Sequence, residues 1–257
     1  MKRIKRFYDT VSIGQLGSNK FNILLNNKAV KTPLGEDLSF ATKGIASAVA
    51  TEWQLQNEYI VPNTMPINTI LMTHIDIDSK MPRIEKFQQI NRFIQTDTLR
   101  FPDTDEKSKL YMAQGEKWSK ILSYLSSKGI KFSQSSNGIA LPDSTEQEIK
   151  EINKTFMERY SSLELSMLET ASKYLKSGST AISLIDGIVS PSEAFEAAYV
   201  EELCQRKEWG LVEGDHDIAD AETMLWLDGI SLLSDIVRRG VYLSYFRFKR
   251  SPYFLVL

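Results

Sequence analysis

The spacing of the apolar residues changes near residue 40, and this change constrains the fold more than any other feature of the chain. Residues 7–13 and 21–25 are rich in β-branched and aromatic side chains, with glycine and serine between them, as in two strands joined by a turn. After residue 40, apolar residues recur at every fourth position, as on one face of a helix. These residues are Ala41, Ile45, Val49 and Trp53. The sequence predicts a small sheet, ending at residues 32–35, with this helix packed against it.

Two asparagines mark a turn inside the strand region. Asn26-Asn27 separates residues 23–25 from Ala29-Val30. Asparagine tolerates positive φ, so this pair predicts a tight hairpin turn.

Helical spacing continues along most of the remaining chain. Residues 67–75 indicate a second helix, and Pro82 opens a third that carries Ile84 on its apolar stripe. A longer stripe from Tyr111 to Leu125 stops at Lys128-Gly129, a basic last turn followed by a left-handed cap.

Two further local predictions concern residues 130–147. Residues 130–133 and 139–141 are expected to be short strands of a hairpin around Asn137-Gly138, and Ser144 with Gln147 fits a capping box. Four helices then complete the chain. They are expected at residues 163–176, 180–189, 192–209 and 220–239.

Composition excludes several classes of protein. With 257 residues and 42% hydrophobic content, the chain can bury a substantial core. No apolar run approaches the roughly 18–20 residues that span a bilayer, so no membrane insertion is expected. The single Cys204 cannot form an intramolecular disulfide, which favours a reducing compartment.

Motifs for chemistry are sparse. No phosphate-binding loop or dinucleotide fingerprint is present, so no cofactor and no catalysis are predicted. His74, Asp76 and Asp78 suggest a metal-dependent enzyme as one alternative, although a charged helix face explains them more simply. The basic residues 1–7 suggest a nucleic-acid-binding module as another. Against this second alternative, the pI is near 5.9 and no basic helix accompanies these residues, so no nucleic-acid partner is expected.

Acidic residues gather toward the carboxy-terminal part of the chain. Residues 193–222 contain ten acidic and two basic residues, a local charge near −8, although the whole chain has a net charge of only −2. On the predicted helix 192–209, Phe195, Ala198, Tyr199 and Leu203 form an apolar stripe. Opposite that stripe are Glu201, Gln205 and Glu208. Two interpretations remain open: an acidic ridge that contacts a partner, or an ordinary solvated face.

Several of these segments together resemble the family of assembly chaperones for mitochondrial and α-proteobacterial ATP synthase. The segments that carry the resemblance lie in the same order along the chain. They are residues 5–8, residues 24–33 with Lys31-Thr32-Pro33, Glu52-Trp53, Gln56, Ile60, Pro62, residues 64–66, residues 95–99, Glu202, Gln205 and Trp209-Gly210. Asn26-Asn27 replaces the usual Asp-Gly of the family, and residues 212–216 suggest a longer loop.

The resemblance implies both a fold and a function. The fold is α+β, with a small β-rich amino-terminal domain that includes one helix, residues 1–66, and a larger helical carboxy-terminal domain, residues 67–257. The function is chaperone activity without catalysis: the protein binds the unassembled alpha subunit of the catalytic head and prevents its aggregation. The implied location is the mitochondrial matrix, with the transit peptide absent or trimmed from this chain.

The resemblance also separates partner-binding from structural residues. The expected partner contact consists of Glu201, Glu202, Gln205 and Glu208, with Asp220 and Glu222. Trp209 and Gly210 are expected to be structural, with Trp209 and Leu203 holding the helix in place. Trp53, Pro62, Met65 and Pro66 are likewise expected to be structural, pinning a stiff connector at the junction of the two domains.

Overall fold

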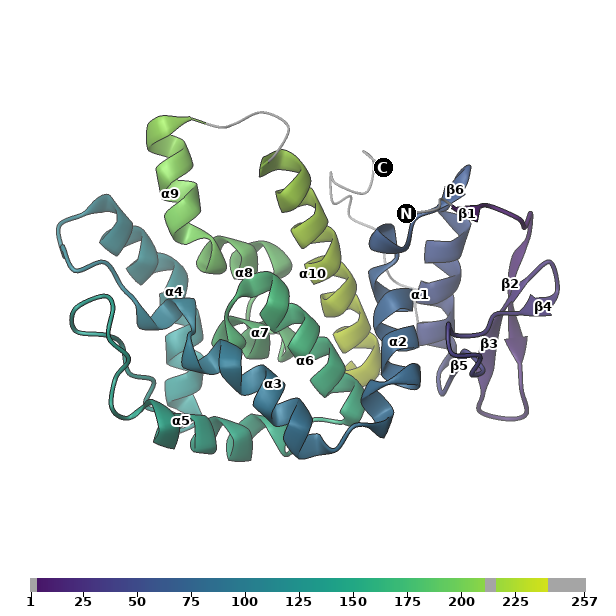
Figure 1. Cartoon of the computed structure of the whole chain (residues 1–257), viewed down its shortest axis with the longest axis horizontal. Helices are drawn as coiled ribbons and strands as arrows, with labels where there is room; N and C mark the ends of the chain where they lie inside the picture. The colour runs from purple at the N-terminus through teal and green to yellow at the C-terminus, as the bar shows by residue number, and fades with distance from the viewer. Residues whose placement is uncertain (1–3, 211–215, 240–257) are drawn as a thin grey trace. The chain divides into compact units, whose positions relative to one another are not determined.

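The computed structural model describes residues 4–210 and 216–239 and has an α+β fold, as the sequence predicts (Figure 1). The strands are β1 (Ile4–Lys5), β2 (Val11–Gln15), β3 (Phe21–Leu25), β4 (Lys28–Ala29), β5 (Ser39–Phe40) and β6 (Tyr59–Ile60). The first α-helices are α1 (Lys43–Gln54), α2 (Pro66–Asp76), α3 (Arg83–Gln95), α4 (Lys109–Ser127) and α5 (Thr145–Ile152). The later ones are α6 (Ser162–Leu175), α7 (Gly178–Ile185), α8 (Pro191–Ala198), α9 (Val200–Trp209) and α10 (His216–Arg239). Single helical turns are η1 (Pro62–Thr64), η2 (Asp78–Lys80), η3 (Thr98–Arg100) and the π-helical η4 (Asn153–Met157).

The chain forms two compact units. Unit 1 comprises Met1–Lys80 and Asp228–Leu257, and unit 2 comprises Met81–Leu227. The sheets belong to unit 1, together with α1, α2 and the last half of α10. The division at residue 66 expected from the resemblance stays a prediction.

The small sheet of unit 1 has the order β2-β3-β4, with β5 also paired to β3. Asn26 and Asn27 have φ of 47° and 64° between β3 and β4, which confirms the predicted turn. The sheet does not end at residues 32–35, because Phe40 of β5 pairs with Phe21. The first predicted strand is also displaced, since β2 begins at Val11.

Helix α1 covers this sheet. It begins after Thr42, whose hydroxyl accepts a hydrogen bond from the Ile45 amide. Ile45, Val49 and Trp53 are buried, as their spacing predicts, whereas Ala41 precedes the helix. Contacts of α1 with β2, β3 and β5 confirm that the helix packs on the sheet.

The helices of unit 2 follow most of the predicted segments. Trp118, Ile121 and Leu125 of α4 are buried, and Gly129 has φ +80° after the helix, as expected. The third helix is rotated from its predicted face. Ile84 is 62% exposed, because Ile90 and Ile94 form the buried stripe instead.

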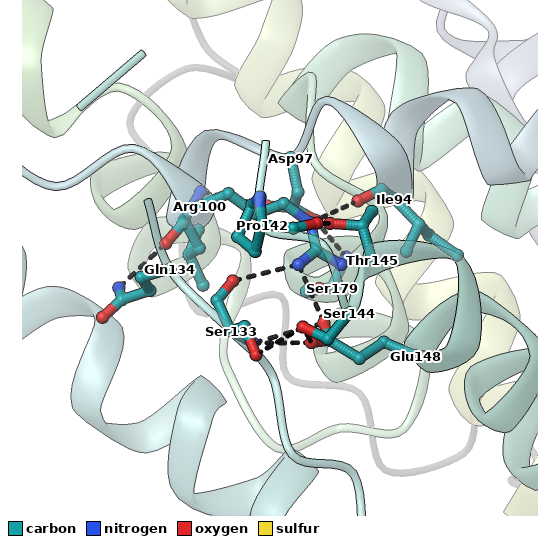
Figure 2. Close-up of polar contacts among 11 residues, drawn as sticks. Ile94, Asp97, Arg100, Ser133, Gln134, Pro142, Ser144, Thr145, Glu148 and Ser179 are labelled. Carbon is teal, nitrogen blue, oxygen red and sulfur yellow. Dashed lines mark hydrogen bonds and ion pairs between the residues drawn. The ribbon is translucent and has the colours of Figure 1, made fainter. Parts of the chain in front are cut away.

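The predicted hairpin at residues 130–141 is wrong. These residues contain no strand. Hydrogen bonds to the buried Arg100 hold the first part of this segment instead. Arg100 is fully buried, and its guanidinium donates to the Ser133 carbonyl (3.0 Å) and to Glu148 (2.8 Å) (Figure 2). The Ser135 amide donates to the Arg100 carbonyl at 2.6 Å.

The predicted capping box at Ser144 is also wrong. The Ser144 hydroxyl donates to Glu148 at 2.6 Å and makes no cap hydrogen bond to the backbone (Figure 2). Burial alone raises the pKa of Glu148, but hydrogen bonds from Ser133, Ser144 and Arg100 hold it below its ordinary value. Capping boxes form instead at Ser161 with Glu164 and at Ser190 with Glu193.

Candidate partner-binding surface

Several residues of the family signature are buried and stabilise the fold. Glu52 accepts hydrogen bonds from the amides of Ile67 (2.9 Å) and Asn68 (2.7 Å), so it caps the amino terminus of α2. Burial raises the pKa of Glu52 to about 8, although these two amide donors lower it. Next to it, Trp53 is buried, and its indole Nε1 donates to Asn68 Oδ1 at 3.0 Å. The prediction that Trp53 belongs to the core is confirmed.

The stretch from Trp53 to Pro66 is held by Gln56. The Gln56 side-chain oxygen accepts from the Val61 amide at 2.8 Å, and its amide group donates to the Glu52 carbonyl and the Thr64 hydroxyl. Val61 and Met65, which precede the two prolines, have extended or intermediate backbone angles, as predicted.

Both prolines of this stretch begin helical turns. Pro62 is exposed at the start of η1, whereas Pro66 is buried at the start of α2, next to the buried Met65. The whole stretch lies inside unit 1, so the structure does not place it at a boundary between units.

Two further signature segments have the same structural role. Thr32 donates to Asp76 Oδ1 (2.5 Å) and the Leu34 amide donates to Asp76 Oδ2 (3.1 Å), so both oxygens of this carboxylate are occupied. In unit 2, fully buried Asp97 accepts from the Ser177 hydroxyl and the Ser179 amide, both at 2.8 Å, and so fixes the start of α7. Burial raises the pKa of Asp97 above its ordinary value against these hydrogen bonds.

The helix that carries the predicted partner contact is shorter than expected. The single helix predicted at residues 192–209 is wrong, because the chain bends at Tyr199 (φ −108°, ψ 19°) and separates α8 from α9. The Tyr199 ring stacks on Phe195, and its hydroxyl donates to the Tyr174 carbonyl at 2.6 Å. These contacts hold the bend without proline or glycine, so local sequence carries no signal for it.

Four of the six predicted contact residues form an exposed surface on α9. Glu201, Glu202, Gln205 and Glu208 are all exposed, and Gln205 donates to Glu201 at 3.4 Å. Asp220 is linked to α9 by an ion pair with Arg206, in which a guanidinium nitrogen lies 2.5 Å from the Asp220 carboxylate. Glu222 is half-buried on α10 and faces Tyr174, whose pKa is raised by burial and by this carboxylate.

Basic residues distant in the sequence neutralise much of this acidic surface. Lys109, Lys117 and Lys120 of α4 pair with Glu208 (3.4 Å), Glu196 (2.9 Å) and Glu193 (2.9 Å), in an antiparallel ladder. Lys176 lies 3.7 Å from Glu202. Because these pairs are exposed, each contributes little stability, but together they reduce the charge near −8 counted along the sequence.

The expected packing role of Trp209 is wrong. Its side chain is 79% exposed at the end of α9, where Gly210 (φ +88°) ends the helix. Only Val200 of α9 is buried, and Leu203 is half-buried, so the helix is anchored at its first turn. Met112 is 59% exposed on α4, one turn beyond the Lys109 that pairs with Glu208. We give the name α9 surface to the following residues: Glu201, Glu202, Gln205, Glu208, Trp209 and Met112.

The α9 surface has the composition of a protein–protein contact. Exposed tryptophan and methionine are enriched in the centres of such interfaces, where they supply large apolar area. The longer loop predicted at residues 212–216 cannot be compared, because residues 212–215 lie outside the described residues.

Comparison with known proteins bears on the family resemblance of this chain. Residues 5–126 match the family model described as ATP12 chaperone protein. A curated relative, protein atp12, mitochondrial, of Schizosaccharomyces pombe, is 24% identical over 90% of this chain and 82% of its own length. Residues 5–126, nearly half of the chain, are therefore similar to the ATP12 chaperone family.

Solved structures agree with the ATP12 fold over nearly the whole chain. The Atu1473 protein of Agrobacterium tumefaciens is 24% identical and has a TM-score of 0.81, over 91% of this chain and 86% of that one. Atp12 from Paracoccus denitrificans is 19% identical and has a TM-score of 0.74, over 91% and 99%. The matched family model ends at residue 126, before α9, so it does not include the α9 surface.

Two features of the described residues bear on other functions. Within residues 4–210 and 216–239, no three metal-binding side chains of the His, Cys, Asp or Glu type come together. Over the same part of the chain, no helix has the length and hydropathy required to cross a bilayer. Asp76, one of the residues considered for a metal, already uses both oxygens in hydrogen bonds.

Proposed function

We propose that this protein is an assembly chaperone for the catalytic head of F-type ATP synthase, acting without catalysis and without ATP. It binds the unassembled alpha subunit and shields that subunit from aggregation until the beta subunit replaces the chaperone. We also propose the mitochondrial matrix as its location, which the name of the S. pombe relative supports. The match of residues 5–126 to the ATP12 chaperone model is the observation that carries the proposal.

The α9 surface is the proposed site of contact. Glu202 and Glu208 are held in exposed ion pairs that a competing basic partner can replace, because such pairs are weak. Trp209 and Met112 supply apolar area beside these charges. An unassembled subunit exposes apolar surface that aggregates, and a temporary cover removes that hazard.

Light scattering tests the chaperone activity directly. Purified alpha subunit is warmed in the absence of nucleotide, with and without an equimolar amount of this protein. Suppressed scattering is expected in the nucleotide-free sample. If suppression requires ATP hydrolysis by this chain, the proposal is wrong.

Charge reversal tests the contact surface. Glu201→Lys, Glu208→Lys and Glu222→Lys, made together, should leave the circular dichroism spectrum unchanged and weaken capture of alpha at least tenfold. The matched control reverses three exposed acids elsewhere in unit 2, Glu106→Lys, Glu146→Lys and Glu158→Lys, and so carries the same change in net charge. Equal binding of alpha by both triple variants would show that α9 presents only a solvated face.

The alternative classes have separate tests. A metal-dependent enzyme using His74, Asp76 and Asp78 requires stoichiometric metal in the purified protein. A nucleic-acid-binding module requires salt-dependent binding to RNA or DNA. Either result would replace the chaperone proposal.

A further inference from the structure

A groove in unit 1 lies between the outer strand of the sheet and α1. It has a volume of about 460 Å³ and is lined by residues of β2, by Phe21 of β3 and by one side of α1. β2 is the terminal strand of the sheet, so its outer edge has no neighbouring strand among the described residues. A groove between an edge strand and a helix is a site where an extended peptide can add as a further strand.

The hydrogen-bonding register shows which groups of β2 point into this edge. The Asn26 amide donates to the Thr10 carbonyl (3.0 Å) and the Leu16 amide donates to the Lys20 carbonyl (2.7 Å). In an antiparallel pair such bonds recur at every second residue, so Ser12 and Gly14 also face β3. The amides and carbonyls of Val11, Ile13 and Gln15 therefore point away from β3, toward the open edge.

The side of α1 that lines the groove leaves room for a strand. It consists of residues spaced by about one turn, with small side chains in the middle. They are Lys43, Ser47, Ala50, Thr51 and Gln54. α1 has 12 residues and is about 18 Å long, and the five residues of β2 extend about 17 Å, so the two walls match in length.

The two ends of the groove differ in charge. Phe21 pairs with Gln15 on one side and with Phe40 on the other. Lys43 follows Phe40 by three residues, so it lies at the end of the groove where Gln15 is. Lys43 is the only charged lining residue and has no ion pair within the described part of the chain. The half-exposed Val11 and Ile13 supply apolar contacts between the ends.

We propose that this groove binds an extended segment of a partner polypeptide by strand addition to β2. The segment runs antiparallel to β2, alternates apolar and polar side chains, and carries an acidic residue near its amino end, beside Lys43. This contact is separate from the α9 surface in unit 2 and does not depend on it.

A synthetic peptide tests the proposal. The probe is a fluorescein-labelled six-residue peptide that begins with glutamate, continues with alternating valine and threonine, and ends in an amide. Fluorescence anisotropy with the full chain should show saturable binding. Gln15→Pro removes one outward amide and no bond to β3, so binding should weaken at least tenfold, whereas Gln15→Ala keeps that amide and should stay within twofold.

Charge reversal tests the orientation. Lys43→Glu should weaken binding of the glutamate peptide at least fivefold and strengthen binding of a peptide that begins with lysine. If Gln15→Pro changes the circular dichroism spectrum, Ser47→Phe, which fills the groove from α1, replaces it with the same expected loss. The triple charge reversal of Glu201, Glu208 and Glu222 should leave peptide binding unchanged, which separates a failure here from a failure of the proposed function.

Three outcomes would overturn the proposal. The first is equal peptide binding by the native chain and Gln15→Pro. The second is a dimer in sedimentation velocity that Gln15→Pro dissociates, which would assign the groove to a second copy of the chain. The third is peptide binding at least tenfold tighter after truncation at Arg239, which would assign the groove to residues 240–257.

Discussion

Two tryptophans show how differently residues of one family signature behave at the scale of single side chains. Trp53 is buried and hydrogen-bonded to Asn68, whereas Trp209 is 79% exposed. Both lie at or near helix ends and both follow an acidic residue, so their local sequences do not separate them. Trp53 therefore stabilises unit 1, whereas Trp209 is available for the proposed contact with a partner.

The same substitution at both tryptophans tests this difference. Trp53→Arg buries an unpaired charge and removes a large apolar side chain, so the free energy of unfolding should fall by about 3–5 kcal/mol or the protein should become insoluble. Trp209→Arg should change it by less than about 0.5 kcal/mol. Urea unfolding followed by circular dichroism measures both. A Trp53→Arg variant with native stability would contradict its assignment to the core.

The buried Glu52 carboxyl predicts a pH dependence of stability. Its pKa is about 8 in the folded protein, because of burial, against 4.5 in the unfolded chain. Between pH 4.5 and 8 the folded state keeps the Glu52 proton, whereas the unfolded chain loses it. The contribution of Glu52 to the free energy of unfolding is therefore complete below pH 4.5 and is lost as the pH rises toward 8. The loss is at most about 1.4 kcal/mol per pH unit.

Glu52→Gln isolates this effect, because the glutamine does not titrate. Unfolding free energies of both proteins are measured by urea titration at pH 5, 6, 7 and 8. As the pH rises, the free energy of unfolding of the native protein should fall relative to that of Glu52→Gln. Parallel curves over this range would show that the Glu52 carboxyl does not titrate between pH 5 and 8.

At the scale of the element, the helices of unit 2 begin where side chains satisfy their free amides. Ser190 accepts from the Glu193 amide, and Glu193 accepts from the Ser190 amide at 2.7 Å, so α8 begins with a complete capping box. Ser144 lies in an equally suitable sequence but forms no capping box. Its hydroxyl donates instead to Glu148, which is paired with Arg100.

A serine pair on α8 tests the capping box. Ser190→Ala leaves amides at the helix start without an acceptor and should cost about 1 kcal/mol. Ser192→Ala, two residues later on the exposed side, should be nearly neutral. Thermal unfolding of both variants gives the comparison, and equal melting temperatures would rule out a stabilising role for the cap.

At the scale of the whole molecule, unit 1 is built from two parts of the chain that are far apart in sequence. Gly229 on α10 lies against Pro66 at the start of α2, and a Cβ built at Gly229 would lie 2.7 Å from the Pro66 ring. Only glycine fits this approach without displacement of the ring. Unit 1 is therefore complete only when α10 has been formed.

Two glycine-to-alanine substitutions test this long-range contact. Gly229→Ala should destabilise the protein by about 1–3 kcal/mol, because the added methyl group collides with Pro66. Gly115→Ala, on α4, has nothing within 4 Å of the added carbon and should stabilise by up to about 1 kcal/mol through helix propensity. Opposite signs in chemical unfolding are expected, and a stabilising Gly229→Ala would contradict the close packing.

The sequence by itself determined the features that depend on neighbours along the chain. The change of hydrophobic period predicted the sheet followed by helices, Asn26-Asn27 predicted its turn, and the order of the signature residues predicted the family. These succeed because backbone angles, helix faces and turns are set by residues within a few positions of one another.

Tertiary structure alone decided the features that depend on distant partners. The bend at Tyr199 is held by a hydrogen bond to the Tyr174 carbonyl. The hairpin predicted at residues 130–141 does not form, because the buried Arg100 binds the backbone there. Lys109 and Lys176 reduce an acidic charge that looks bare along the sequence, and the exposure of Trp209 follows from how little of α9 is buried. Burial and charge pairing are sums over neighbours in space, and the order of residues in one segment does not contain them.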